Sequence, residues 1–356
     1  MKTALKIILY ILLALIILGV GYVAYVFIAY HRVEDNQELT PTADAALEQV
    51  EAGREYSILS YNIGFGAYSA DYSFFMDGGE YSRAFSAQAV KDNTAGAMDA
   101  AQAENADFLF IQEVDTDSTR SYHVDQSSLL RDRFSGYDSV FALNYDSPYL
   151  LYPLSSPHGK SVAGIMTFST VKIQSAVRHS LPVEGGFMKF LDLDRCYSVS
   201  RVQVDNGKTL CLYNMHLSAY SSDGTIATEQ LELLLADMKA EYEAGNYVLC
   251  GGDFNKDLLG DSSKVFGVSG ENYTWAQSFP FESIPKGFSL VAALDEENPV
   301  PSARNADAPY DPKTAFVLTI DGFIVSDNIS VSAASVVDTG FAWSDHNPVK
   351  MSFTLQ

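Results

Sequence analysis

The chain has few cysteines for a protein of 356 residues. Only Cys196, Cys211 and Cys250 are present, too few for the disulfide framework that holds many small exported domains together. Their separations also do not match the paired spacing of a zinc site. Cys250 lies in an apolar run that predicts a buried strand, and we interpret all three cysteines as small core residues.

Basic residues are scarce as well. Lysine and arginine together number 23 against 45 aspartates and glutamates, which gives a formal net charge of −22. A field of that sign opposes non-specific binding to nucleic acid or to an anionic membrane. It does not exclude a phosphate-bearing ligand, because bound divalent cations can reverse the local charge. The composition therefore argues against one class alone, a high-affinity DNA-binding protein.

Charge is absent from one long stretch near the N-terminus. The 24 residues 7–30 contain no charged side chain, and a helix of that length spans about 36 Å, enough to cross a bilayer. A cleaved signal peptide is the alternative. The run is longer than the apolar region of a signal peptide and ends without a small-x-small cleavage site. We therefore favour an uncleaved signal anchor over residues 7–30.

The charges that flank this run predict its orientation. Lys2 and Lys6 precede it, whereas the residues that follow Arg32 are mainly acidic. The positive-inside rule places residues 1–6 in the cytoplasm and the large domain outside the cell, as in a single-pass protein of the cell membrane. Residues 31–54 are polar and predict a juxtamembrane linker or short helix. Residues 55–356 show no point at which they divide into two domains.

The rest of the chain predicts many strands and few helices. Strands are expected over 56–61, 107–111, 139–143, 162–168, 172–180, 196–204, 209–214, 247–250, 316–320, 329–337 and 349–355, and helices over 86–106, 127–134 and 226–243. The strands at 162–168 and 172–180 are expected to form an antiparallel pair, and those at 196–204 and 209–214 a hairpin around the Asn206-Gly207 turn. Mixed sheets with helices on their outer faces fit this order.

The most informative stretch is 247–257. Four apolar residues predict a short buried strand, two glycines interrupt it, and Asp253 and Asn255 follow. In an extended segment these two side chains lie on the same face. A carboxylate and an amide at a strand end suit a hard cation, a water and a phosphate. Gly-Gly-Asp-x-Asn is equally good turn chemistry, so this stretch alone leaves turn and site open.

Polar side chains stand at the ends of other predicted strands too. They are Asn62, Glu113, His216, Asp321, Asp345 and His346. Active sites collect at such places, because a rigid scaffold there presents polar groups to one cleft. Packing alone gives no reason for so many strands to end in this way. We therefore predict that these residues and the 253–255 pair share one site.

Six motifs that carry these residues resemble the endonuclease/exonuclease/phosphatase superfamily, whose members are similar to deoxyribonuclease I. They are Ser60-Tyr61-Asn62, Ile111-Gln112-Glu113, Asn214-Met215-His216-Leu217, Gly252-Asp253-Phe254-Asn255, Ile320-Asp321-Gly322-Phe323 and Ser344-Asp345-His346-Asn347-Pro348. Their order and spacing match from residue 55 to the C-terminus. The resemblance implies a four-layer α/β sandwich, in which two mixed, mostly antiparallel sheets pack face to face with helices outside. Here a transmembrane helix would precede it.

The resemblance also implies a metal site. Glu113 would be the principal ligand of Mg²⁺, with Mn²⁺ as the alternative ion. Asn62 and Asp345 would complete or support the site, and waters would fill the remaining positions.

The remaining residues would carry the chemistry that the resemblance implies. Asp253 would orient and deprotonate the attacking water, and Asn255 would hold the water or a phosphate oxygen. His346 would stabilise charge in the transition state, with Asp321 fixing its tautomer and raising its pKa. His216 would be a second imidazole that binds phosphate or donates a proton.

Loop residues outside the motifs are weaker candidates. Tyr149 and Lys160 could bind substrate. Several other polar or cationic loop side chains could also border the cleft, although a surface or structural role suits each of them better: Arg120, Tyr122, His123 and His158.

Three functions fit these observations. The first is a membrane-anchored, Mg²⁺-dependent hydrolase on the outer surface, acting on a phosphoester such as a lipid head group, a nucleic acid or a small phosphodiester. The second is an anchored extracellular nuclease, against which the acidity of the chain argues. The third is a non-catalytic ectodomain that binds a ligand. The combination of acid, base and amide residues favours a hydrolase, and no obligate protein partner is expected.

Overall fold

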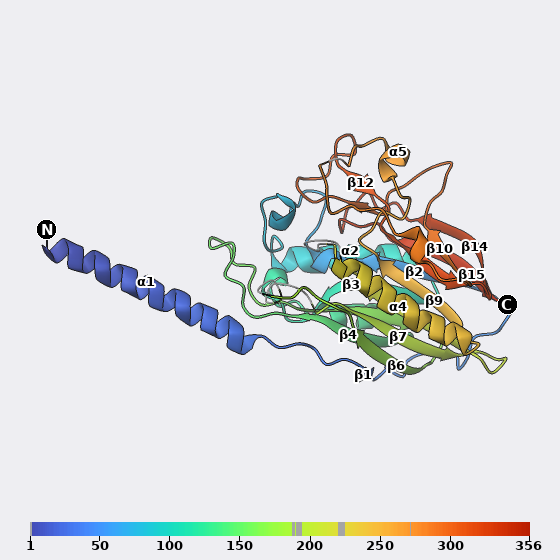
Figure 1. Cartoon of the computed structure of the whole chain (residues 1–356). Helices are drawn as coiled ribbons and strands as arrows, with labels where there is room; N and C mark the ends of the chain where they lie inside the picture. Colours follow the sequence, from blue (N-terminus) through green and yellow to red (C-terminus); the bar gives the residue numbers. More distant parts are fainter. Residues whose placement is uncertain (1, 187–188, 190–193, 220–224, 271) are drawn as a thin grey trace.

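Two sheets, with helices packed on them and a separate N-terminal helix, form the framework of the chain (Figure 1). The computed structural model describes residues 2–186, 189, 194–219, 225–270 and 272–356. Met1 of the predicted cytoplasmic segment and Tyr220, which follows the motif around His216, lie outside the described residues.

Helix α1 (Lys2–Ala29) projects away from the sheets (Figure 1). It is long and apolar enough to cross a membrane, and Val26 is its only buried residue. Lys2 and Lys6 lie in its first two turns, and no acidic residue interrupts it.

The first sheet has six strands in the order β14-β15-β2-β3-β5-β4. Their bounds are β14 (Ile329–Val336), β15 (Val349–Leu355), β2 (Glu55–Asn62), β3 (Phe108–Asp115), β5 (Val162–Ser169) and β4 (Asp138–Asp146). Only β2 and β3 run parallel, joined by helix α2 (Ala87–Ala103). Ser86 caps α2 by accepting a hydrogen bond from the Ala89 backbone. Helix α3 (Gln126–Arg133) follows β3 on the same face.

The second sheet has seven strands in the order β1-β6-β7-β8-β9-β13-β10. Their bounds are β1 (Gln37–Leu39), β6 (Ile173–Ser180), β7 (Cys196–Gln203), β8 (Thr209–His216), β9 (Tyr247–Asp253), β13 (Asp321–Ser326) and β10 (Phe288–Ala292). Strands β7 and β8 form the predicted hairpin. Strands β8 and β9 are parallel, and helix α4 (Thr225–Glu243) connects them.

The two-residue period of the strands places apolar side chains in separate layers. On β9, Tyr247 and Leu249 join the core between the sheets, whereas Val248 and Cys250 pack under α4. Strand β2 divides in the same way, with Ile58 in the central core and Tyr61 under α2. The result is the predicted four-layer sandwich of helix, sheet, sheet and helix.

One predicted pairing is wrong. Strands β5 and β6 are separated by a short link, yet they do not form a hairpin. Strand β5 pairs with β3 and β4, whereas β6 pairs with β1 and β7 in the other sheet. The chain crosses between the sheets at Val171, whose side chain is fully buried in the core between them. A hairpin would keep both strands in one sheet, whereas this link passes from one sheet to the other with Val171 buried between them.

Residues 31–54, expected to form a linker or short helix, lie along the second sheet. Strand β1 pairs with β6, and Val50 is fully buried in the central core. The buried guanidinium of Arg178 donates hydrogen bonds to the carbonyl oxygens of Glu34, at 2.9 Å, and Leu143, at 2.6 Å. The chain is therefore held against the domain within a few residues of the end of α1.

The 257–316 region is mostly loop, as predicted, with short elements. These are α5 (Ser262–Phe266), β10, and β11 (Ala303–Arg304), which pairs with β12 (Val317–Leu318). The bridge between Ala303 and His346 brings this region against the C-terminal motif.

Candidate active site

Strand register brings the predicted residues together. His216 is the partner of Asp253 across the parallel β8–β9 pair, and Asp321 is the partner of Asp253 across the antiparallel β9–β13 pair. Asp321 thus stands at the start of its strand rather than at the end of a preceding one. Asn62 ends β2 on the facing sheet.

The two glycines before Asp253 allow the close approach of neighbouring strands. Gly252 has φ of 142°, and a Cβ placed on it would lie 2.0 Å from the carbonyl oxygen of Met215 on β8. A Cβ on Gly251 would meet the ring of Phe323 at 2.6 Å. Glycine is required for this close approach, and both glycines lie inside β9 rather than in a turn after it.

Asp253 is at the centre of the site and is almost fully buried. Its Oδ2 accepts a hydrogen bond from Asn62 Nδ2 at 3.1 Å and lies 3.4 Å from His216 Nε2 and 3.7 Å from His346 Nε2. Its Oδ1 accepts the backbone N–H of Asn255 at 2.9 Å. Burial raises the pKa of Asp253 to about 7, against the lowering effect of His346.

His346 forms a buried pair with Asp321. The distance from His346 Nδ1 to Asp321 Oδ2 is 2.8 Å, which directs Nε2 towards Asp253. Burial by itself would lower the pKa of His346, but Asp321 and Asp253 hold it well above its ordinary value. The imidazole is therefore cationic at neutral pH.

His216 contacts the same carboxylate, but as a neutral imidazole. Burial holds the pKa of His216 well below its ordinary value, and the positive charges of Arg195 and His346 add to this effect. Its Nδ1 is buried and has no hydrogen-bond partner within the part of the chain that the structure describes. A neutral imidazole here can hold or pass a proton at Asp253.

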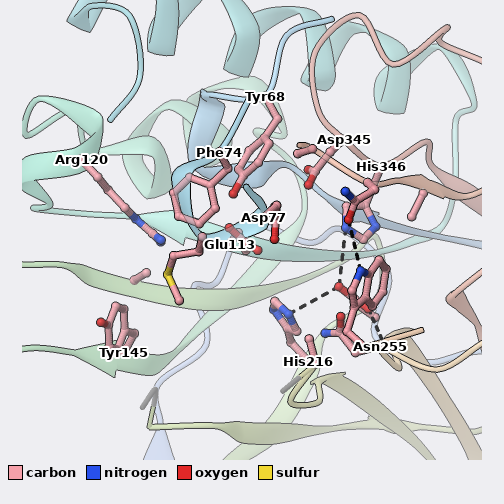
Figure 2. A pocket seen from close by; sticks show the side chains of 18 of the residues that line it. Tyr68, Phe74, Asp77, Glu113, Arg120, Tyr145, His216, Asn255, Asp345 and His346 are labelled. Atoms are coloured by element: carbon pink, nitrogen blue, oxygen red, sulfur yellow. Dashed lines mark hydrogen bonds and ion pairs between the residues drawn. The ribbon is translucent and has the colours of Figure 1, made fainter. Parts of the chain in front are cut away.

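Glu113 projects from a bulge in β3. Its φ is 54°, and the register between β3 and β5 shifts around it. Figure 2 shows Glu113 between Arg120 on one side and Asp345 and His346 on the other. Burial raises the pKa of Glu113; Arg120 opposes this rise and Asp345 adds to it. Two carboxylates that repel one another in this way favour a cation between them.

Asn62 connects these groups. Its Nδ2 donates to Asp253 and, at 3.3 Å, to Glu113 Oε1, and its Oδ1 accepts the Gly64 backbone N–H at 3.0 Å. The amide nitrogen therefore faces both carboxylates, and the arrangement positions them. The resemblance also allows Asn62 to be a metal ligand. In that role its Oδ1 would have to bind the ion and the Gly64 N–H at once.

Asn255 and its neighbours form the wall opposite Glu113. The backbone of Asn255 is in the left-handed region, with φ of 50°, and its Nδ2 donates to the Leu217 carbonyl oxygen at 2.8 Å. In Figure 2, Asn255 and His216 lie on the same side of the pocket. The side-chain oxygen of Asn255 stays available to a ligand.

These residues surround a cavity of about 450 Å³. Glu113, His216, Asp253, Asn255, Asp345 and His346 all contribute to its lining. Asn62 and Asp321 are buried behind its wall, where they hold the groups that line it.

The two weaker candidates lie outside the cavity lining. The backbone N–H and carbonyl of Tyr149 form hydrogen bonds with the hydroxyls of Tyr25 and Tyr22 on α1. Lys160 is exposed, and its Nζ forms an ion pair with Asp146 at 3.1 Å.

Three arginines line the cavity: Arg120, Arg195 and Arg304. Arg120, bound to Asp115 through two hydrogen bonds, packs over the ring of Phe65 at 4.0 Å. Arg195 lies on the cavity wall just before β7. Arg195 carries no sequence signal, because it stands alone in a loop with no motif around it.

Buried hydrogen bonds hold the motifs in place, and of the residues that make them Ser302 lies outside every predicted motif. The Ser302 hydroxyl donates to Asp321 at 2.8 Å, and the Ser344 hydroxyl donates to the Asn62 carbonyl oxygen at 2.8 Å. Gln112 Nε2 donates to Asn214 Oδ1 at 2.9 Å and so joins the two sheets behind the site. Gln112 and Asn214 were part of the quoted motifs, and this buried bond supplies their role.

Hard oxygen donors make the Glu113 side of the cavity suitable for a divalent cation. Glu113 and Asp345 are partly buried carboxylates that face the same space, which matches the ligand preference of Mg²⁺. Asp253, Asp321 and His346 also present donor atoms within 4.8 Å of one another. There, however, His346 Nδ1 and Asp321 Oδ2 already satisfy each other, so the Glu113 side fits the ion better.

A family profile now accounts for the arrangement. The profile of the Endonuclease/Exonuclease/phosphatase family matches residues 59–346. The chain belongs to this family. Members of the family are phosphoesterases, so the chain is a hydrolase of the kind that acts on phosphoester bonds. No curated protein matches the chain.

Solved structures of family members share the fold. An endonuclease/exonuclease/phosphatase from Beutenbergia cavernae DSM 12333 has 18% identity and a TM-score of 0.57, over 85% of this chain and 72% of that one. ANGEL2, a 2',3'-cyclic phosphatase in complex with adenosine-2',3'-vanadate, has 17% identity and a TM-score of 0.56, over 90% and 99%. D. rerio TDP2, humanized by 14 mutations, has 16% identity and a TM-score of 0.52, over 84% and 99%.

The buried His158 generates a prediction about stability. Its Nδ1 lies 2.8 Å from the Ser82 carbonyl oxygen, and burial, with Arg120, lowers its pKa to about 4. The folded-state pKa lies below the unfolded value, so the unfolded chain binds the proton first and folding stability falls between pH 6.5 and 4. We expect a loss of up to about 3 kcal/mol from this residue. His158→Gln should remove that part of the pH dependence in urea unfolding.

The test compares how steeply the free energy of unfolding changes with pH in wild type and in His158→Gln, since acidic groups titrate in the same range in both proteins. His123→Gln provides a matched control, because His123 is exposed. Equal slopes for wild type and His158→Gln would contradict a neutral buried His158.

Proposed function

We propose that this family member is a Mg²⁺-dependent phosphodiesterase, held at the membrane by α1 with its catalytic domain outside the cell. The observation that supports it best is the environment of Asp253. This buried carboxylate, whose pKa is raised, faces one cationic and one neutral imidazole. The same cavity is lined by two further carboxylates, Glu113 and Asp345. Such an arrangement suits water attack on an anionic phosphorus centre.

The proposed roles follow from the contacts. Asp253 holds the attacking water at Oδ2 and takes its proton, while Asn62 and the Asn255 N–H fix the carboxylate. Cationic His346, oriented by Asp321, stabilises charge that develops on the phosphoryl oxygens. Neutral His216 serves as a second donor beside Asp253. The amide oxygen of Asn255 positions the water or the phosphate.

In this proposal Glu113 and Asp345 hold the metal ion, and Asn62 positions Glu113. When bound, the ion would polarise the phosphoester and neutralise its charge. Arg120 and Arg195 add positive charge to a cavity within a strongly acidic chain, which favours an anionic substrate.

The catalytic assignment predicts large losses from conservative substitutions. Asp253→Asn and His346→Gln should each lower kcat by about 100-fold or more, since each removes a group that acts on the reacting atoms. The measurement uses the full chain in detergent with bis(p-nitrophenyl) phosphate, sphingomyelin and plasmid DNA as substrates.

Asp132→Asn and His123→Gln are matched controls on exposed residues and should retain activity. Activity that survives both active-site substitutions would refute the assigned site. A wild-type chain that cleaves only plasmid DNA would identify a nuclease instead, and a chain inactive on all three substrates would support a binding ectodomain.

The metal assignment predicts loss of activity on chelation with EDTA and recovery on addition of Mg²⁺. Glu113→Gln should raise the Mg²⁺ concentration for half-maximal activity roughly tenfold or more, because it removes an anionic ligand. Glu229→Gln, on the exposed face of α4, should leave it unchanged. Full activity in EDTA would exclude the metal-dependent mechanism.

The location predicts that protease added to intact cells digests the catalytic domain. Lys2 and Lys6 on the preceding side of the apolar helix support this orientation. Mass spectrometry of the purified protein should find residues 1–30 still attached. A protected domain would reverse the orientation, and a mass that lacks the helix would make it a cleaved signal sequence.

A further inference from the structure

The mouth of the cavity carries exposed apolar side chains. Met76 and Tyr152 line the cavity and are 61% and 71% exposed, whereas Asp253 and His346 at its base are 1% and 6% exposed. Exposure thus rises from the reacting groups to these two residues. They mark the side from which a substrate enters.

The loop that supplies Tyr152 continues this surface. Leu151 is 37% exposed and Leu154 is 82% exposed. We refer to Met76, Leu151, Tyr152 and Leu154 as the apolar rim. Large apolar side chains that gather at one edge of a soluble domain indicate a contact surface.

This loop is held in place at its base and on its C-terminal side. Leu150 and Gly159 form a bridge that closes its base. His158 bonds to the Ser82 carbonyl oxygen, and Arg83 Nε donates to the Pro157 carbonyl oxygen at 2.5 Å. The ring of Phe75 packs against Tyr152, with centroids 5.8 Å apart. The exposed side chains therefore project from a fixed base rather than from a free loop.

The same loop is bonded to the apolar helix. The hydroxyl of Tyr22 accepts the Leu151 N–H at 3.1 Å and donates to the Tyr149 carbonyl oxygen at 3.1 Å. The hydroxyl of Tyr25 accepts the Tyr149 N–H at 3.0 Å. In Figure 1 the loop is part of the green hairpin that extends from the domain on the side of α1.

These contacts fix the depth of the loop relative to α1. Tyr22 and Tyr25 lie near the C-terminal end of α1, where tyrosines of a spanning helix meet the membrane–water interface. A loop whose backbone bonds to them is at the same level. The two tyrosine hydroxyls also accept the backbone N–H groups of residues 149 and 151. An N–H group without an acceptor would be costly at the edge of a bilayer.

We propose that the apolar rim inserts into the membrane surface and that the cavity takes the phosphoester head group of a lipid in the same leaflet. The assignment of the substrate rests on the proposed function, whereas the docking of the rim does not. A bilayer fits better than a protein or nucleic acid, because the rim continues directly from a helix that is itself apolar enough to be in the membrane. Strong negative charge on the chain also opposes nucleic acid.

The docking is tested by a fluorescent label on Leu154→Cys in the full chain. The native Cys196, Cys211 and Cys250 are buried, so labelling is confined to the new thiol. In phosphatidylcholine vesicles that carry nitroxide lipids, emission from the label should fall about twofold or more. The same label on Leu233→Cys, on the outer face of α4, should stay unquenched. Equal emission at the two positions would overturn the docking.

The substrate class is tested with Leu151→Ser/Leu154→Ser. Neither residue is part of the cavity lining, so hydrolysis of bis(p-nitrophenyl) phosphate should stay within about twofold of wild type, whereas hydrolysis of bilayer phospholipid should fall about tenfold or more. Leu233→Ser/Val265→Ser removes two exposed apolar side chains elsewhere and should change neither rate.

The outcomes separate the two claims. A quenched label in a chain that hydrolyses no phosphoester would overturn the proposed function and leave the docking intact. An active chain that cleaves plasmid DNA faster than bilayer phospholipid would overturn the lipid substrate. Equal loss of both rates in the Leu151→Ser/Leu154→Ser variant would overturn the role of the rim.

Discussion

The hydrogen bond between Asn62 and Asp253 is the contact on which the candidate active site depends. Asn62 ends a strand of the six-stranded sheet and Asp253 ends a strand of the seven-stranded sheet, so the bond exists only when the two sheets pack at the right spacing. The core between the sheets sets that spacing. The buried hydrogen bond from Gln112 to Asn214 is a second polar link between the same two sheets. Packing of the core and assembly of the site are therefore one process.

The Asp253 carboxylate lies between two imidazoles that differ in charge, cationic His346 and neutral His216. Both histidines are buried, but only His346 has an anion on its far side, Asp321. Asp321 and Asp253 together hold His346 cationic, whereas burial and the positive charges of Arg195 and His346 leave His216 neutral. The site thus places a cation and a neutral imidazole, from the same residue type, within reach of Asp253.

Much of this arrangement was predictable from sequence, for reasons that differ between its parts. Alternating burial gave the strands, and β15 runs over the predicted 349–355. Polar residues at strand ends gave the site, because register then brings neighbouring ends together. The pairing of β5 with β6 failed, since local sequence does not show that Val171 is buried between the sheets. Ser302 and Arg195 were missed because each acts through tertiary contacts that leave no local pattern.

Arg178 binds the Glu34 carbonyl oxygen, so the connection between α1 and the sheet is at most residues 30–33. Such a link spans about 14 Å when fully extended. If α1 crosses the bilayer, the domain cannot drift away from the surface or turn freely upon it. Encounter with a lipid is then a search in a plane, governed by lateral diffusion and by the amount of lipid per unit area rather than per unit volume. Dilution of the surrounding solution would leave the turnover of such a substrate unchanged.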